Sequence, residues 1–566
     1  MAAEPFDVLI VGSGAGGGMA AYELTRRGLK VLMLEAGRNY DPVTETPMFN
    51  LPSEAPLRGE PTPDKPFGFY DATIGGGWDV PDEPYTVAEG SEFKWWRPRM
   101  LGGRTNHWGR IALRFGPYDF KPYSRDGLGF DWPVGYDDIA PWYDKVEKLI
   151  GVSGGPPQGL ENIPDSPVDC LQPAPPPKTY ELLVTRAFAS MGIPSAPTHA
   201  AILTQPLGDR AACFYATSCI RGCAIKANFQ STTVLIPPAL ATGNLSVRTD
   251  ALVYQVDLDK AGKASGVSFV DRRTGAHHSV RARIVVLSAG AGETARILLN
   301  SKSTLFPDGI GNGDGLVGRY LMDTVGTKVT ARIPALEDMP VTNDDGMSVM
   351  HSYIPWWGHG MQARKELDFP RGYHVEMQGG RIMPSFSMVD WIDDGQGLRG
   401  PELRAMMRRR FGSTLRMSSR GEMIPNDDSY CDLDPKVKDK WGIPVLRFHW
   451  KWGETEIRQA AHAAKMFEDV IGRMGGTIVP PFERDGAKAI SKGGEIIHEV
   501  GTARMGDAER NSVVDRLGRS WAVRNLFVAD GAVMVSSPDK NPTLSILALS
   551  WRTATHLGDL AQRGEL

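Results

Sequence analysis

The segment DVLIVGSGAGGGMAAYELTRRGLKVLMLEAG, residues 7–37, constrains the fold of this chain more than any other stretch. Its apolar run Val8–Val11 is long enough for one buried parallel strand, and residues 19–27 space their apolar side chains as a helix does. A second apolar run, residues 30–34, ends at Glu35. A strand, a glycine turn, a helix, a strand and an acid in this order predict a βαβ unit of a parallel sheet.

The glycines of this unit suit a phosphate-binding turn. Gly12 permits a tight turn, Gly14 lets the backbone approach a pyrophosphate, and Gly17 lets the helix pack closely on the strand. The helix N-terminus supplies N–H groups and a positive dipole. Glu35 follows the glycine motif at the usual distance of ~20 residues, where an acidic side chain accepts hydrogen bonds from ribose hydroxyls. A glycine-rich surface turn is the alternative for the motif alone, but the complete unit predicts a dinucleotide site, for FAD or NAD.

Length and composition limit the classes of protein that fit. A chain of 566 residues is too long for one ordinary core, so we expect several domains or one elaborated fold. The net charge of -4 means that basic residues are not in excess, as they usually are in nucleic-acid-binding proteins, so we expect no nucleic-acid partner. No run approaches the ~20 apolar residues of a membrane span, and we expect no direct span. The start MAAEPFDVLIVGSG lacks the pattern of a signal peptide, which predicts a chain without its own export signal.

The C-terminal region favours a flavin over a nicotinamide. Residues 526–529 have the character of a strand that runs into Asp530 and Gly531. Residues 542–549 are predicted to begin a helix, because Pro542 suits the first helical turn. The positive end of a helix is a reasonable partner for the electron-rich edge of a flavin ring.

Several blocks of this chain follow one another in the order of a known family. The blocks are GSGAGG with Glu35, RPRMLGGRTNHWGR (97–110), LSAGAGETARILLNS (287–301), HEVGTARMG (498–506) and VADGAVMVSSPDKNPT (528–543). On these blocks the chain resembles the glucose–methanol–choline (GMC) family of flavoprotein oxidoreductases. Residues 421–450 also look like the strand-rich region that precedes the family's active-site block.

The resemblance implies an α/β and α+β fold, with a Rossmann-like FAD-binding domain and a second, antiparallel-sheet substrate domain. Residues 1–320 are expected to form mainly the FAD-binding domain, with the cysteine loop 211–228 and insertions of the substrate domain. Residues 321–490 are expected to form mainly the substrate-binding domain, and residues 491–566 to return to the FAD-binding domain with active-site residues.

The pattern of the middle region also predicts an antiparallel sheet with one face toward a pocket. Apolar and polar residues alternate, with aromatics among them, in HSYIPWWGHG (351–360), YHVEMQGGRIMPSFSM (373–388) and MSSRGEMIPN (417–426). Aromatic faces beside amides and carboxylates suit a sugar, and an aromatic sandwich core is the alternative. The expectation of a sugar or glucoside substrate comes mainly from the family resemblance.

Carried over position by position, the resemblance implies a set of FAD contacts. Those expected at the ADP half are Gly12, Gly14, Gly17 and Glu35, with the backbone of Val253 at the adenine and Gly290 near the pyrophosphate. Those expected along the flavin and ribityl chain are Gly102, Gly103, Asn106, His107, Trp108, Asp530, Gly531 and Thr543. The FAD is expected to be non-covalent, and a flavin–histidyl bond through His107 is the alternative.

The same resemblance implies two catalytic side chains above the flavin, His498 and Asn541. A neutral imidazole, with a reference pKa near ~6.5, can take the hydroxyl proton while hydride leaves the same carbon for flavin N5. An amide cannot take the proton, but it can orient the substrate oxygen. A buried structural histidine and a helix-capping asparagine are the alternatives for the two residues.

Three of the five cysteines, Cys213, Cys219 and Cys223, lie within the segment ACFYATSCIRGCAIKAN (212–228). A disulfide would leave one over, zinc needs a fourth ligand, and a nucleophile needs only one thiol. Three closely spaced thiolates suit an iron–sulfur cluster. The segment is similar to the loop that carries a 3Fe–4S cluster in glucose dehydrogenase catalytic subunits of the family, although its first gap is about one residue longer. Free or zinc-bound thiols are the alternative.

Within the family, the blocks TNHWGR, SCIRGC and WKWGETE look most like glucoside 3-dehydrogenase catalytic subunits. That resemblance implies oxidation of carbon-3 of a sugar, with electrons leaving through the cluster to a cytochrome or quinone. It also implies a small export-chaperone subunit, a cytochrome c subunit or another acceptor, and a periplasmic location by co-export, or a cytoplasmic one without that subunit. The alternatives are an enzyme that acts at another carbon or on oxygen without a functional cluster, and a non-catalytic flavoprotein.

Overall fold

The computed structural model describes residues 6–46, 54, 56–59, 62, 75–156, 158–215, 218–340, 349–381 and 397–566. The predicted segment 373–388 therefore lies outside the described residues from position 382 onward. No helix in the described ranges combines the length and apolar character that crossing a membrane requires.

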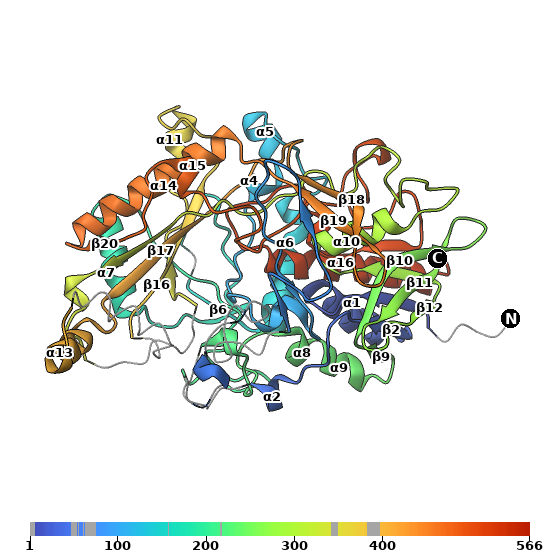
Figure 1. Cartoon of the computed structure of the whole chain (residues 1–566), viewed down its shortest axis with the longest axis horizontal. Coiled ribbons are helices and arrows are strands. Elements are labelled where there is room, and N and C mark those ends of the chain that lie inside the picture. The colour runs from blue at the N-terminus through green and yellow to red at the C-terminus, as the bar shows by residue number, and fades with distance from the viewer. Residues whose placement is uncertain are drawn as a thin grey trace.

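The N-terminal segment forms the predicted βαβ unit at the centre of a five-stranded parallel sheet. Its strands, in spatial order, are β21 (Leu526–Val528), β13 (Ile284–Leu287), β1 (Val8–Val11), β2 (Val31–Leu34) and β9 (Leu245–Arg248). Every residue of β1, β2 and β13 is buried, as expected for strands covered on both faces. In Figure 1, α1 lies close to β2 and β9 on the right of the molecule.

Helix α1 (Ala15–Arg26) begins four residues before the predicted start at residue 19, because its first turn is built of glycines that carry no apolar signal. A Cβ on Gly16 would lie 1.8 Å from the carbonyl oxygen of Ala529, and one on Gly17 would lie 2.0 Å from that of Gly12. The glycines therefore let the helix start against neighbouring backbone.

The C-terminal helix of the described residues packs against this unit. Helix α16 (Thr543–Gln562) packs against α1 and against α6 (Tyr136–Ile150). The rings of Tyr22 and Trp551 meet edge to face across the α1–α16 contact, with centroids 5.9 Å apart. The last helix of the chain therefore stabilises the first.

A four-stranded antiparallel sheet forms the other half of the molecule, on the left of Figure 1. Its strands, in spatial order, are β16 (Tyr373–Gly379), β17 (Thr414–Gly421), β14 (Lys328–Arg332) and β20 (Thr477–Val479). Helix α14 (Glu454–Arg473) packs on β14, β17 and β20. Helix α7 (Thr179–Ala189) packs against α14, so a segment from the N-terminal half of the chain is inserted here. The predicted antiparallel sheet is confirmed.

The remaining elements connect and cover these two sheets. A three-stranded antiparallel sheet comprises β10 (Ala251–Leu258), β11 (Ala264–Asp271) and β12 (His277–Arg281). The other strands are β3 (Gly76–Gly77), β4 (Thr86–Val87), β5 (Arg97–Pro98), β6 (Val152–Gly154), β7 (Leu171–Pro173), β8 (Ala196–Pro197), β15 (Ser352–Tyr353), β18 (Tyr430–Lys438) and β19 (Pro444–His449). The other α-helices of the described residues are α2 (Pro42–Glu45), α4 (Pro117–Phe120), α5 (Pro122–Asp126), α8 (Ser231–Val234), α9 (Ile236–Ala241), α10 (Ala291–Asn300), α11 (His359–Ala363), α13 (Gly400–Arg410) and α15 (Gly486–Ala489).

Candidate active site

A cleft of about 340 Å³ lies at the carboxyl ends of β1, β2 and β13, where ligands bind in parallel sheets. It contains most of the residues that the sequence singles out. Those lining it are Gly12, Gly14, Glu35, Gly103, His107, Trp108, Val253, Gly290, His498, Asp530, Gly531, Asn541 and Thr543. The structure thus brings together residues from both ends and the middle of the chain.

The three other predicted FAD residues, Gly17, Gly102 and Asn106, support the wall of this cleft. Gly17 packs α1 on the glycine turn, as described above. The N–H of Gly102 donates to Oγ of Ser13 at 2.8 Å. The side chain of Asn106 donates to the carbonyl oxygen of Leu101 at 2.7 Å, so it shapes the loop that carries His107 and Trp108.

The glycine turn leaves room for a phosphate-bearing ligand. A Cβ built on Gly14 or on Gly290 would meet no described atom within 4 Å, so both backbones face open space. A Cβ on Gly12, in contrast, would lie 2.3 Å from the carbonyl oxygen of Ser288, and its φ of +98° favours glycine. Gly12 is therefore needed by the fold, whereas Gly14 and Gly290 form a cradle that fits the pyrophosphate of FAD.

Glu35 lies buried at the end of β2. Its Oε2 accepts from the hydroxyl of Ser13 at 2.5 Å, and its Oε1 accepts from the N–H of Gly37 at 2.8 Å. Burial raises the pKa of Glu35, and these hydrogen bonds and Arg99 oppose that rise. A carboxylate has about four lone-pair sites, so it retains acceptor capacity for ribose hydroxyls.

His498 is held at the opposite part of the cleft by two neighbouring residues. Its Nδ1 lies 2.9 Å from Oγ1 of Thr324, and its backbone N–H donates to Oδ1 of Asp323 at 2.9 Å. An antiparallel bridge between Met322 and Val500 joins the two segments. Burial and the positive charge of Arg420 lower the pKa of His498 to about 3, so the imidazole is neutral at physiological pH.

Asn541 is oriented by a carboxylate from the antiparallel sheet. Its Nδ2 donates to Oε1 of Glu376 at 3.2 Å, and Arg420 contacts the other oxygen of Glu376 at 2.8 Å. Burial alone would raise the pKa of Glu376, but Arg420, His374 and Asn541 lower it to about 2. An ionised carboxylate only accepts hydrogen bonds, so the Nδ2 of Asn541 must face Glu376. Among the described residues, none hydrogen-bonds the buried Oδ1 of Asn541.

Four residues of the site, Thr324, His374, Glu376 and Arg420, stand in no sequence pattern that predicts a role for them. His374 and Glu376 are two residues apart on β16, so they share one face of the strand, and His374 pairs with Arg420 in the β16–β17 register. The alternate residue Tyr373 faces the other way, where its hydroxyl lies 2.8 Å from Nδ1 of His462 on α14. The alternation of YHVEM could have revealed the shared face, but not its partner Arg420.

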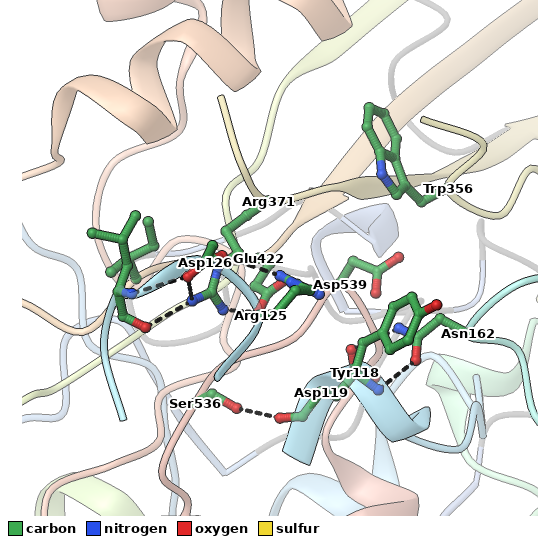
Figure 2. A network of polar contacts seen from close by, with 12 residues as sticks. Tyr118, Asp119, Arg125, Asp126, Asn162, Trp356, Arg371, Glu422, Ser536 and Asp539 are labelled. Atoms are coloured by element: carbon green, nitrogen blue, oxygen red, sulfur yellow. Dashed lines mark hydrogen bonds and ion pairs between the residues drawn. The ribbon is translucent and has the colours of Figure 1, made fainter. Parts of the chain in front are cut away.

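A buried polar network supports the loop that carries Asn541. Lys540 is 4 % exposed, and its Nζ ion-pairs with Asp119 at 3.1 Å and with Asp539 at 2.6 Å. The carbonyl oxygen of Asp539 accepts from Nδ1 of His374. Figure 2 shows Asp539 near Asp119, whose carbonyl oxygen accepts from Ser536 at 3.1 Å. The loop is therefore tied both to α4 and to β16.

A second part of this network joins the two halves of the molecule (Figure 2). Arg371, before β16, forms ion pairs with Glu422, after β17, and with Asp126 of α5 at 2.6 Å. Arg125 contacts the other oxygen of Glu422 at 3.2 Å. These buried pairs fix the antiparallel sheet against the segment that precedes α6.

The cysteine loop lies beside the segment 106–110, which carries His107 and Trp108, and its cysteines do not line the cleft. None of the five cysteines, all of which lie in the described ranges, is joined to another by a disulfide. Cys219 and Cys223 are buried and Cys213 is half-buried. The sulfur of Cys223 accepts from the N–H of Ala227 at 3.3 Å, and that of Cys213 accepts from the N–H of Tyr215 at 3.5 Å. Backbone N–H groups directed at sulfur suit thiolates better than neutral thiols.

Comparison with known proteins assigns the chain to one family. A family model described as GMC oxidoreductase matches residues 6–323, and a second with the same description matches residues 425–550. The chain therefore belongs to the GMC oxidoreductases, a family of FAD-dependent enzymes that act on alcohol or sugar hydroxyls. The predicted family and fold class are confirmed.

Relatives match the chain over nearly its whole length. It is 30% identical to 2-methyl-1,2-propanediol dehydrogenase of Mycolicibacterium austroafricanum, over 98% of this chain and 95% of that protein. It is 29% identical to the fructose dehydrogenase large subunit of Gluconobacter japonicus, over 98% of each. A solved structure of Aspergillus oryzae formate oxidase superposes with a TM-score of 0.66 at 16% identity, covering 100% of this chain and 99% of that one.

Proposed function

We propose that this protein is an FAD-dependent dehydrogenase that oxidises a hydroxyl of a sugar or glucoside, at carbon-3, to a ketone. The observation that carries the proposal is the pair of His498 and Asn541 in one cleft with the FAD cradle. His498 is neutral there, and Asn541 presents an oxygen with no described partner. A hydroxyl between them would meet a base and an acceptor.

His498 is the proposed general base. With Nδ1 donating to the hydroxyl oxygen of Thr324, its Nε2 keeps a lone pair for the substrate proton. FAD, when bound, supplies flavin N5, which accepts the hydride from the same carbon. The positive charge of Arg420 keeps the imidazole unprotonated before the substrate arrives.

Asn541 is the proposed orienting residue. Glu376 holds its Nδ2, so its Oδ1 is directed away from Glu376. An oxygen acceptor without a partner would bind a hydroxyl of the substrate and fix its rotation. The hydrogen bond to Glu376 also restricts rotation of the Asn541 side chain in the free enzyme, which reduces the conformational entropy lost when substrate binds.

A polyhydroxy substrate is supported by the relatives. One acts on fructose and another on a diol, and both match this chain along its length. Carbon-3 as the site of oxidation rests on the resemblance of TNHWGR, SCIRGC and WKWGETE to glucoside 3-dehydrogenases.

A 3Fe–4S cluster held by Cys213, Cys219 and Cys223 is the proposed electron exit, and it would supply one-electron transfer to a cytochrome or quinone. The N–H groups directed at two of the sulfurs support it. The words "large subunit" in the name of the Gluconobacter relative support partner subunits for this chain as well. We propose a small export subunit, a cytochrome c subunit or other acceptor, and a periplasmic location through co-export.

One experiment tests the two redox groups and the reaction together. The visible spectrum, iron content and acid-labile sulfide of freshly purified protein are measured, and glucosides are then added without oxygen. We expect flavin bands, about three irons per chain, and bleaching with formation of a 3-keto sugar. Flavin without iron or sulfide would overturn the cluster. A keto group at another carbon would overturn the assignment of carbon-3, and rapid oxygen consumption would support the oxidase alternative.

A further inference from the structure

Two buried arginines beside the cysteine loop lack a carboxylate partner. Arg110 is 0% exposed and Arg210 is 5% exposed, and neither forms an ion pair with any described residue. The buried Arg114, in contrast, contacts Glu147 at 2.5 Å. Arg97 and Arg504 are buried and also form no ion pair with a described residue, but their guanidinium groups lie over the rings of Trp95 and Phe130. Burying an unpaired charge is costly, so the two guanidinium groups indicate that a negative charge belongs nearby.

The hydrogen bonds of Arg110 and Arg210 do not supply that charge. Arg110 donates to the carbonyl oxygens of Trp108 and of Asn106, the latter at 2.8 Å. Arg210 donates to the carbonyl oxygens of Lys226 at 2.9 Å and of Ile150 at 2.8 Å. Carbonyl groups satisfy N–H donors but carry no net charge.

Each guanidinium also keeps one N–H group unused. Within the described part of the chain, Nε of Arg110 and Nη2 of Arg210 are buried without a hydrogen-bond partner. Arg110 and Arg210 each therefore lack both a charge partner and one hydrogen-bond acceptor among the described residues.

The groups that act electrostatically on these arginines are chiefly the cysteines. Cys219 and Cys223 act on Arg110, together with Tyr40, and Cys223 acts on Arg210, together with Asp209. Asp209 is largely exposed and pairs with Lys226 at 3.0 Å. A thiol that coordinates a metal is deprotonated, so a cluster on these cysteines would supply the negative charge that the two guanidinium groups lack.

We propose that Arg110 and Arg210 are the counter-charges of an anionic iron–sulfur cluster on Cys213, Cys219 and Cys223, and that they raise its reduction potential. This inference rests on the proposed function, which places the cluster there. Reduction adds one negative charge at this site, so two nearby positive charges stabilise the reduced form more than the oxidised form.

Arg110 has a second role in this arrangement. Its guanidinium binds the backbone at Asn106 and Trp108, and Trp108 lines the cleft. The same side chain thereby joins the cysteine loop to the segment expected to lie along the flavin. Arg110 is therefore a positioning residue between the two redox groups, whereas Arg210 binds only backbone outside the cleft.

The test compares charge-removing and charge-keeping variants of the whole protein, Arg110→Met with Arg110→Lys and Arg210→Met with Arg210→Lys. Arg484→Met is the matched control, because Arg484 is exposed and pairs with Glu468 on α14. Iron, acid-labile sulfide and the midpoint potential from a redox titration followed by electron paramagnetic resonance are measured. We expect a more negative potential in both methionine variants, a value near wild type in the lysine variants, and no change in the control.

The outcomes separate this inference from the proposed cluster. Wild-type protein without iron would overturn both. Iron-loaded methionine variants with an unchanged potential would overturn the inference alone. Loss of iron from the methionine variants but not from the lysine variants would support the counter-charge, and loss from both kinds would overturn it.

Discussion

Asn541 and Glu376 come from opposite halves of the molecule and meet at 3.2 Å, with the amide Nδ2 donating to the carboxylate. Asn541 precedes α16, which packs on α1 of the N-terminal βαβ unit. Glu376 lies on β16 of the antiparallel sheet. Because the carboxylate is ionised, this contact decides which end of the amide is left for a substrate. The orientation of an active-site residue is thus set across the junction between the halves.

This contact predicts the effect of Glu376→Gln. A glutamine amide can either donate or accept, so Asn541 would be free to turn, and Arg420 would lose its charge partner. We expect kcat/KM to fall by about tenfold or more, with the flavin retained. Steady-state kinetics and the flavin spectrum check this. Glu468→Gln on α14 is the control, and equal kinetics in both variants would contradict the orienting role.

Replacing His498 tests the general base. His498→Ala is expected to keep its yellow FAD but to lose sugar-dependent bleaching by a factor on the order of 10²–10⁴. Stopped-flow absorbance without oxygen measures the rate. Thr324→Val, which removes the hydroxyl beside Nδ1, should lower the rate less because the base itself remains. Bleaching at the wild-type rate in His498→Ala would remove the assignment.

The lowered pKa of His498 makes a prediction about pH. A base acts when deprotonated, and burial with Arg420 lowers the pKa of His498 to about 3, so kcat/KM should stay level from about pH 8 to about pH 5. In Arg420→Met the loss of the positive charge favours the imidazolium, so the acidic decline should move to higher pH. Profiles of kcat/KM for the two proteins test the direction of the shift. A shift to lower pH would contradict this electrostatic account.

Two neighbouring glycines are expected to respond differently to alanine. Gly14→Ala puts a methyl group into open space at the cradle, so the protein should fold but lose most of its FAD. Gly17→Ala puts one 2.0 Å from the carbonyl oxygen of Gly12, which should destabilise the fold by about 1–3 kcal/mol. Flavin content and melting temperature are measured for both. Equal loss of stability in the two variants would contradict the distinction.

Replacing the buried Lys540 is expected to lower the free energy of unfolding strongly. Lys540→Met would leave Asp119 and Asp539 buried without their shared cation, at a cost of about 3–5 kcal/mol. Lys465→Met is the control, because Lys465 is exposed and pairs with Asp469 within α14. Denaturant unfolding compares the two. A variant of Lys540 as stable as the control would show that the buried pairs contribute little.

The sequence predicts those parts of the protein in which local pattern and local structure coincide. Residues 7–37 form the expected unit because their apolar runs and glycines lie within one stretch of chain. The predicted strand at 526–529 and the helix that follows are likewise found, as β21 and α16. The predicted start of α1 is four residues too late. The glycines of its first turn are required by close contacts with neighbouring backbone, and such contacts leave no apolar periodicity in the sequence.

The candidate site is predictable only in part, for a physical reason. His498 and Asn541 stand in recognisable blocks. Glu376, which orients Asn541, is kept ionised by Arg420, and the pairing of these two residues depends on the register of β16 and β17. The counter-charge proposed for Arg110 is similarly invisible in RPRMLGGRTNHWGR, where an arginine looks like a surface residue. Burial without a partner is a property of the folded chain alone.

The contact between α16 and α1 also has a consequence for the order of events during synthesis. The cradle begins at residue 12, yet β21 and α16, which complete the sheet and its covering layer, follow only at residues 526–562. A growing chain therefore carries its glycine turn through the synthesis of all the segments between them, without the residues that close the site. We expect FAD to bind only after residue 562 has been made, so that the cofactor joins a chain whose site is complete rather than guiding the folding of an unfinished one.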